Sequence, residues 1–337
     1  MSGAPATVPL TERPSPAGEG RRRLGAAARG RLWAYGIWAV LALLVLVLVA
    51  VSPSFRTSTN LTNILEQNSM LGIVALGMLV MMVSGGFDLS VGAVGATSAV
   101  VGAYLSAHGG LWAAIPGALA VGLLVGLANG LLIARARINA FVTTFAMASV
   151  VTGIMFVATS ASPINANAGW LVTLALDRIG GIPYAFIAYV LVALLTGFAL
   201  SRTKWGHYVY AVGGNREASF LSGVPVVPTQ LAAFIYGGLC AAIGGLILLG
   251  QSDIGQPSSA TDWPLTAIAI CVIGGVSLMG GEGRLHGTIA ATFVLGVISN
   301  GLNLLNVSPY IQPTVTGAVI LIAVALDRVS RRRQAAG

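Results

Sequence analysis

Charged residues are scarce in this sequence, and their scarcity excludes most soluble folds. Only 8% of the 337 residues are Asp, Glu, Lys or Arg, while 56% are hydrophobic and the mean hydropathy is +0.86. Because a soluble domain carries about a quarter charged residues, the composition predicts a polytopic, all-α membrane protein. The 44 glycines fit close helix–helix packing in such a protein.

Cysteine, histidine and lysine are also scarce, which argues against metal sites and several kinds of enzyme. Cys240 and Cys271 stand in apolar runs and are expected to be small buried side chains. The three histidines show no metal-ligand spacing. Lys204 is the only lysine and follows no glycine-rich loop, so the chain has no P-loop for ATP. Without a Gly-x-Ser-x-Gly, His-Glu-x-x-His or paired-carboxylate pattern, no catalytic site and no metal site are expected.

Apolar windows of about 20 residues predict ten membrane spans. They lie at 33–51, 65–84, 89–107, 111–133, 140–160, 183–200, 230–250, 265–280, 287–305 and 311–326. The Pro-, Gly-, Ala- and Arg-rich segment 1–32 is expected to be a disordered leader, followed by a transmembrane domain over 33–328 and a basic tail over 329–337. The start also resembles a signal peptide, but the first apolar run is long enough to span and lacks a clear cleavage site.

Basic residues orient these spans. With the N-terminus inside, 16 of the 18 Lys and Arg residues fall on the cytoplasmic side, and only Arg56 and Arg178 fall outside. This matches the positive-inside rule, so both termini are predicted to be cytoplasmic. The net charge of +8 is then a signal of topology, and nucleic acid is not an expected partner.

A single carboxylate stands in an otherwise apolar run. From Leu71 to Ala107 the only formal charge is Asp88, within the stretch GGFDLSVG at 85–92. A charge at membrane depth is usually buried, paired or set beside a transport route, and glycines can interrupt a helix only where the backbone is shielded or lines a cavity. The predicted topology puts the segment at the inner end of two spans, which favours a shaped turn over a solute contact. Residues predicted for the pathway or for helix breaks are Gly85, Gly86, Asp88, Ser90, Gly92, Gly274, Gly275, Asn300 and Asn303.

The other polar groups of the spans are mostly uncharged amides and hydroxyls. They suit either a neutral solute or helix–helix hydrogen bonds; they include Asn129, Thr143, Thr144, Ser149 and Thr152, with Glu66 near an outer end. The tripeptide Asn-Gly-Leu recurs at 129–131 and 300–302 in spans of opposite direction. This echo indicates an inverted repeat of spans two to five and seven to ten.

Two loops are candidates for contacts with partners. In the inner loop 201–229, Asn215 can cap a short helix over 216–221 that Gly223 and Pro225 close, and the pattern fits docking and mere connection equally well. The outer loop 161–182 fits a surface cap or a plain connector.

Three motifs together resemble one family. They are GGFDLSVG at 85–92, AVGGNREASFLSGVPV at 211–226, and the long segment from AIAICVIGGVSLMGGEGRLHG to LIAVALD at 267–327. The chain from about Asn60 to Asp327 is similar to the permease subunits of ribose-type sugar ABC importers, which serve ribose, xylose, galactose, inositol or autoinducer-2.

The resemblance implies a bacterial inner-membrane permease that passes a neutral sugar inward as one of two copies, a homodimer. A separate cytoplasmic ABC ATPase would use the ATP, an extracytoplasmic sugar-binding protein would deliver the solute, and this chain would bind no cofactor. The resemblance also assigns loop 201–229 to ATPase coupling. The implied docking residues are Gly213, Gly214, Asn215, Glu217, Ala218, Ser222 and Gly223.

The chain departs from the family pattern at two places, and these leave the solute open. His207 follows Gly206 where the family often has Arg, and Trp263 to Thr266 replace a stretch that often carries two acids. The alternatives are an ABC permease for a nucleoside or an amino acid, and a secondary carrier that works alone.

Overall fold

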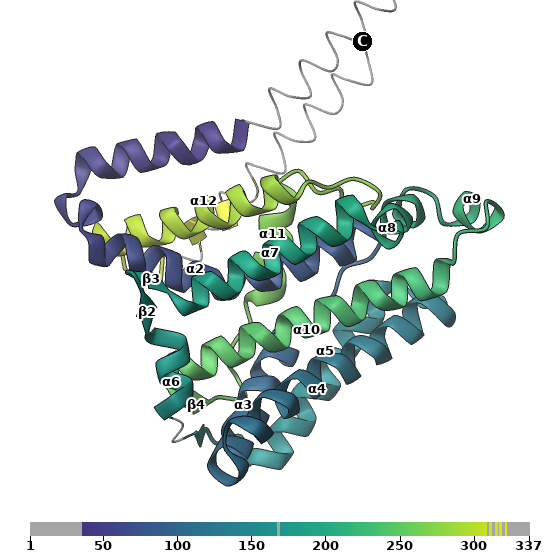
Figure 1. Cartoon of the computed structure of the whole chain (residues 1–337), viewed down its shortest axis with the longest axis horizontal. Helices are drawn as coiled ribbons and strands as arrows, with labels where there is room; N and C mark the ends of the chain where they lie inside the picture. Colours follow the sequence, from purple (N-terminus) through teal and green to yellow (C-terminus); the bar gives the residue numbers. More distant parts are fainter. Residues whose placement is uncertain are drawn as a thin grey trace, which may run out of the picture. The chain divides into compact units, whose positions relative to one another are not determined.

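The computed structural model describes residues 36–166 and 169–308, together with single positions between 310 and 321. These residues form α-helices joined by short turns and two-residue strands (Figure 1). Several predicted segments lie outside the described residues: the leader 1–32, the first residues of the first span, most of the span 311–326, and the tail 329–337.

In the described part of the chain, seven helices are long and apolar enough to cross a membrane. They are α2 (Ser58–Val83), α3 (Val91–Gly109), α4 (Leu111–Gly130) with the π-helical η2 (Leu131–Arg135), α5 (Ala140–Thr159), α7 (Tyr184–Arg202), α10 (Val226–Ser252) and α12 (Leu285–Leu304). Two shorter apolar helices are Gly36–Val51 and α11 (Trp263–Ile273). The prediction of an all-α, polytopic membrane protein is confirmed, while the count of ten, the orientation and the inverted repeat stay predictions.

The remaining elements are short connections. They are the 3-10 turn η1 (Pro53–Arg56), β1 (Ile164–Asn165), α6 (Gly169–Leu176), β2 (Arg178–Ile179), β3 (Ile182–Pro183), α8 (Lys204–Gly214), α9 (Arg216–Leu221) and β4 (Ile254–Gly255). Strand β1 pairs antiparallel with β4, and β2 pairs antiparallel with β3. The predicted outer loop 161–182 is therefore ordered into one helix and three strand segments, and the predicted inner loop 201–229 holds α8 as well as α9.

The predicted helix over 265–280 is wrong in its second half. Helix α11 ends at Ile273, and Gly274 begins a turn in which Gly275 has a φ of +85°. A second turn follows, where Gly280 and Gly281 have φ values of +87° and +73°. Glycine reaches these angles without the clash of a Cβ atom. Hydropathy missed the break because Val276, Leu278 and Met279 keep the window apolar.

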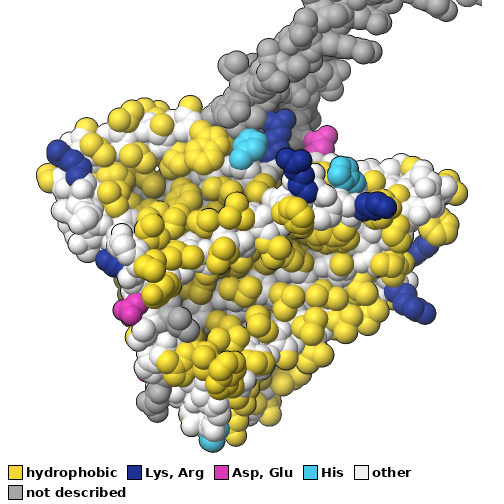
Figure 2. Space-filling model, in the orientation of Figure 1, with side chains coloured by type: hydrophobic (Ala, Val, Ile, Leu, Met, Phe, Trp, Pro, Cys, Tyr) yellow, Lys and Arg dark blue, Asp and Glu magenta, His cyan; other side chains and the backbone are white. Residues whose placement is uncertain are grey.

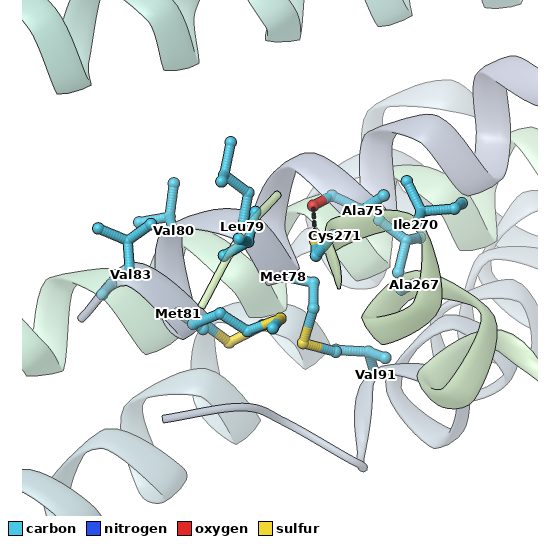
Figure 3. Packing of buried hydrophobic residues seen from close by; sticks show 14 of the residues in the cluster. Ala75, Met78, Leu79, Val80, Met81, Val83, Val91, Ala267, Ile270 and Cys271 are labelled. Atoms are coloured by element: carbon cyan, nitrogen blue, oxygen red, sulfur yellow. Dashed lines mark hydrogen bonds between the residues drawn. The ribbon is translucent and has the colours of Figure 1, made fainter. Parts of the chain in front are cut away.

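Helix α2 forms the centre of the core, because its second half is buried from Gly72 to Val83. Figure 3 shows this half packed against Val91 of α3 and against Ala267, Ile270 and Cys271 of α11. The Cys271 thiol donates to Ala75 O at 3.3 Å. Both cysteines are buried and free, as the sequence predicts.

Glycines let the helices approach closely, as their abundance suggested. A Cβ atom on Gly238 of α10 would stand 2.2 Å from Gly122 O of α4, and one on Gly245 would stand 2.2 Å from Gly95 O of α3. Helix α10 thus lies almost backbone to backbone against two neighbours.

The surface is largely hydrophobic, which is what a lipid-facing helix bundle requires. Figure 2 shows an almost continuous apolar face with Lys and Arg side chains gathered toward its edges. Large apolar side chains are more than half exposed on the outer helices, for example Val157 of α5 and Leu194 and Phe198 of α7.

The two ends of α10 contact different connections (Figure 1). Its first residues lie beside α8 and α9, whereas a Cβ atom on Gly250 near its last turn would stand 2.4 Å from Ala175 of α6. We call these the α9 end and the α6 end. Helix α2 begins at the α6 end, where Glu66 contacts Arg178 of β2, and it ends at the α9 end.

Candidate functional site

The connection Ser84–Ser90 interrupts what would otherwise be one long apolar helix. Helix α2 ends at Val83 and α3 begins at Val91. Gly85 has a φ of +92°, and its N–H and that of Gly86 donate to Met82 O and Met81 O. A Cβ atom on Gly92 would stand 2.2 Å from Ala260 O. The break is therefore built on one glycine that turns the chain and another that allows close packing.

Asp88 is buried in this break and bound by neutral donors. It is 1% exposed. Its Oδ1 accepts from Ser90 N at 2.6 Å and from the Ser90 hydroxyl at 2.5 Å, and its Oδ2 accepts from the Asn129 amide at 3.1 Å. The Asn129 amide also donates to Ser90 Oγ at 2.9 Å. The carboxylate thus lies at the N-terminus of α3, where the helix dipole favours a negative charge.

Two effects oppose each other at the Asp88 carboxyl. Burial raises its pKa, and the hydrogen bonds from Ser90 and then Asn129 lower it. Among the described residues no cation forms a salt bridge with it. A carboxylate that already accepts three bonds is a structural support of the turn rather than an open binding group. Whether the break lines a transport route stays a prediction.

Helix α5 also holds the break in place. The Leu89 N–H donates to Thr144 Oγ1 at 3.0 Å, and the Thr144 hydroxyl donates to Ala140 O in the first turn of α5. Thr144 is fully buried. The connection is therefore bonded to α4 through Asn129 and to α5 through Thr144.

The last carbonyl groups of α2 are capped by distant segments. A helix end leaves its last carbonyls without partners inside the helix. Here Val83 O accepts from Gly281 N at 2.9 Å, and Ser84 O accepts from the Gln230 amide at 3.1 Å. Gln230 lies in the second turn of α10 and is 5% exposed. The α11–α12 connection and α10 thus both bind the end of α2.

Three glycine segments meet at the same place. A Cβ atom on Gly213 of α8 would stand 1.8 Å from Val83 O, and one on Gly280 would stand 2.7 Å from Gly85 Cα. A Cβ atom on Gly281 would stand 2.5 Å from Gly214 Cα. We call Gly85, Gly213, Gly280 and Gly281 the glycine junction, because their backbones touch with no side chain between them.

The short surface helix predicted over 216–221 is confirmed as α9. Asn215 caps it by accepting from Ala218 N at 2.9 Å, and Gly223 with a φ of +80° follows its end. Phe220 and Leu221 are 69% and 79% exposed. Helix α9 therefore presents an apolar tip to the surroundings.

The residues implied for docking divide into two groups. Asn215, Glu217, Ala218, Ser222 and Gly223 are exposed on or beside α9. Gly213 and Gly214 instead form the last turn of α8, and Gly213 packs inward on Val83. Gly213 is therefore part of the glycine junction, while the docking role implied for these residues stays a prediction.

The other predicted pathway residues lie elsewhere. Asn300 of α12 exchanges two hydrogen bonds with Asn60 at the start of α2, at 2.8 and 3.1 Å, and Asn303 is exposed one turn further on. Asn300 and Asn303 thus lie at the α6 end, whereas Asp88 follows the opposite end of α2. Gly274 packs against Gly287, since its Cβ atom would stand 2.6 Å from Thr288 N. The structure does not bring these residues together with the Asp88 break.

An apolar groove opens between α7 and α12. Phe186, Tyr189 and Leu194 line it from α7, and Ile289 and Phe293 line it from α12. Its lining offers no polar surface, so it does not suit a polar solute. Among the described residues no group of His, Cys, Asp or Glu could hold a metal ion.

Sequence reasoning missed the side-chain contacts of Arg216 and Gln230. Arg216 served to orient the spans and to begin the predicted helix over 216–221, and Gln230 marked the start of a span. The Arg216 guanidinium donates to Gln230 Oε1 and to Ala134 O of η2, each at 2.6 Å. Burial and then the nearby Arg137 lower the pKa of Arg216. The sequence signal that could have found this contact was a polar Gln230 close to the start of an otherwise apolar span.

The fold and the site define a class of protein: a multi-pass membrane protein with broken helices, of the kind that transport proteins use to line or support a route. A family profile described as the permease component of the branched-chain amino acid transport system matches residues 60–324. The chain therefore belongs to this family of permease components, and it is a multi-pass inner-membrane protein.

Comparison with curated proteins shows several similar permeases. The chain is 37% identical to the ribose import permease protein RbsC of Escherichia coli strain K12 over 304 residues, which are 88% of this chain and 95% of that protein. It is 37% identical to the L-arabinose transport system permease protein AraH of the same strain over 308 residues, 90% and 93% of the two chains. The ribose import permease protein RbsC of Bacillus subtilis strain 168 is 37% identical over 293 residues, 85% and 90%. No solved structure matches.

Proposed function

We propose that this chain forms the translocation pathway for a monosaccharide or a related polar solute in an ABC importer. The names of its relatives support the solute class, since similar permeases serve ribose and L-arabinose over nearly the whole chain. The chain itself carries no catalytic site and binds no cofactor in this proposal, and the ATP is used by a separate ATPase.

The single structural observation that supports a neutral solute concerns two acids, Glu66 within α2 and Asp88 in the connection that follows it. Asp88 is buried and bound by Ser90 and Asn129. Glu66 lies 3.6 Å from Arg178. Both carboxylates thus already have partners within the chain, whereas a charged solute is expected to need a compensating charge along its route.

The proposed assembly places partners at both ends of the helices. A cytoplasmic ATPase docks on the exposed surface of α9, whose apolar tip Phe220–Leu221 offers the contact. An extracytoplasmic sugar-binding protein docks at the α6 end. A second copy of the chain completes the pathway as a homodimer. The termini and the α9 end then lie in the cytoplasm of a bacterial cell.

Uptake by the purified importer tests this function. The chain is reconstituted in vesicles with its partner ATPase and binding protein, and uptake of labelled ribose, L-arabinose, leucine and uridine is measured. We expect uptake of a sugar that depends on ATP and on the binding protein. Uptake of leucine or uridine alone, or solute uptake by this chain without the ATPase, would overturn the proposal.

A second candidate is the import of an amino acid. The printed description of the family profile, which refers to branched-chain amino acids, is what favours it. The leucine arm of the same uptake experiment decides between the two.

A further inference from the structure

The Arg216 side chain connects the surface helix α9 to two deeper segments. Arg216 is the first residue of α9. Its Nη1 atom donates to Gln230 Oε1 and its Nη2 atom donates to Ala134 O, each at 2.6 Å. The planar guanidinium presents several N–H donors in a fixed fork, so one side chain can hold two acceptors in a fixed relation.

Gln230 passes the first contact on to the helix break. Its Oε1 accepts from Arg216 while its Nε2 donates to Ser84 O at 3.1 Å. Because one neighbour is a donor and the other an acceptor, the orientation of the buried amide is determined by its partners. A continuous path of hydrogen bonds therefore runs from α9 to the residue that precedes Gly85.

The second contact reaches the segment that supports Asp88. Ala134 O of the π-helical η2 accepts from Arg216, and Ile138, which follows η2, donates its N–H to Leu132 O. Asn129, which binds the Asp88 carboxylate, lies in the last turn of α4 directly before η2. Both branches from Arg216 thus end at the connection between α2 and α3.

We propose that Arg216 is a positioning residue that transmits movement of α9 to the break between α2 and α3, through Gln230 on one branch and Ala134 on the other. The proposal rests on the proposed function, in which an ATPase moves α9. Helix α9 has six residues and an exposed tip, so it can follow a docked partner as one unit. The relay then carries that displacement to Ser84, where the glycine junction allows the backbone to shift without side-chain clashes.

The test measures coupling rather than activity alone. In the reconstituted importer, Arg216→Gln is expected to lower solute uptake about tenfold, which corresponds to about 1.4 kcal/mol, while ATP hydrolysis stays within about twofold of the wild type. The number of ATP molecules used per solute therefore rises about fivefold or more. Arg216→Lys replaces the planar guanidinium with an ammonium group that can still bind one acceptor. Its ratio of ATP to solute is expected to lie between those of the wild type and of Arg216→Gln.

A second variant separates the relay from general damage. Gln230→Glu keeps an acceptor for Arg216 but removes the donor to Ser84 O, and it is expected to raise the same ratio. Combining it with Arg216→Gln should add little, because both changes break one path. Arg135→Gln removes an exposed arginine from η2 and serves as the matched control, with an unchanged ratio.

Hydrogen exchange of the assembled importer gives an independent readout. Both relay variants are expected to speed amide exchange in 84–92 relative to the control. An unchanged ratio of ATP to solute in both variants would overturn the relay even if uptake fell. A wild-type importer that takes up no sugar would instead overturn the proposed function, and the exchange measurement would still decide whether the relay holds the break.

Discussion

The two ends of the α2 helix are held by different kinds of contact. At the α9 end its last carbonyls are capped by Gln230 and Gly281, and the surrounding glycine backbones touch directly. At the α6 end the contacts are made by side chains, an Asn60–Asn300 pair and an ion pair of Glu66 with Arg178.

The difference indicates a division of labour. The backbone contacts of Gly213, Gly280 and Gly281 leave no room for an added Cβ atom, so a movement at one glycine displaces the others. Side-chain pairs that are partly exposed can re-form in a new geometry at small cost. The α9 end is thus suited to transmit a displacement, and the α6 end to yield to it. Substitutions at the two ends should therefore differ in size of effect.

The largest effect is expected from Gly213→Ala. The new Cβ atom would stand 1.8 Å from Val83 O, and neither backbone can turn away as a flexible side chain could. Overpacking of this kind lowers the free energy of unfolding by about 3 kcal/mol, measured by denaturant titration of the purified chain in detergent.

Gly153→Ala in α5 is the matched control for Gly213→Ala. No atom lies within 4 Å of the added methyl group, and alanine favours a helix more than glycine by about 1 kcal/mol. We therefore expect equal or slightly higher stability. If the two alanine variants unfolded at the same denaturant concentration, the tight backbone contact at the α9 end would be refuted.

Asp88→Asn is expected to rank second, at about 2 kcal/mol of lost stability. The substitution replaces one carboxylate oxygen with an NH2 group. This group would face a hydrogen-bond donor of Ser90 or of Asn129, so one of the present hydrogen bonds would be lost. Asp177→Asn, at an exposed acid of the α6 end, should leave the unfolding midpoint unchanged. Equal midpoints for the two variants would show that the Asp88 network does not support the break.

The sequence was sufficient for the class of fold and for the helix α9. Long apolar runs and few charges have one physical solution, a bundle of membrane helices. Asn215 and Gly223 are strong local signals for the two ends of a short helix. In the structure Asn215 caps the start of α9, and Gly223 follows its end. These features depend on residues that are close in the sequence.

The contacts of the site depend on residues that are distant in the sequence. Nothing local to Gln230 shows that its amide reaches Ser84 O, 146 residues away. Nothing local to Gly213 shows its contact with Val83, because Val83 belongs to another helix. The early end of α11 was missed because hydropathy does not record a positive φ at Gly275.

The Asn60–Asn300 pair should have a smaller energy than the contacts at the α9 end. Hydrogen bonds between membrane helices average about 0.6 kcal/mol in double-mutant cycles. We expect a coupling free energy of that size from Asn60→Ala, Asn300→Ala and the double variant, measured by the same denaturant titration. A coupling of about 2 kcal/mol or more would place this pair among the rigid contacts and weaken the contrast between the ends.

The smallest effect is expected from the ion pair of Glu66 and Arg178. Their atoms lie 3.6 Å apart and the Arg178 side chain is 37% exposed, so solvent and salt screen the attraction. A double-mutant cycle with Glu66→Gln and Arg178→Gln should give about 0.5 kcal/mol or less, falling further when the salt concentration is raised. If this coupling instead resisted high salt and matched the loss in Asp88→Asn, the α6 end would be as firmly held as the α9 end. Movement would then have to be absorbed within the helices themselves, which the tight glycine contacts of α10 with α3 and α4 oppose.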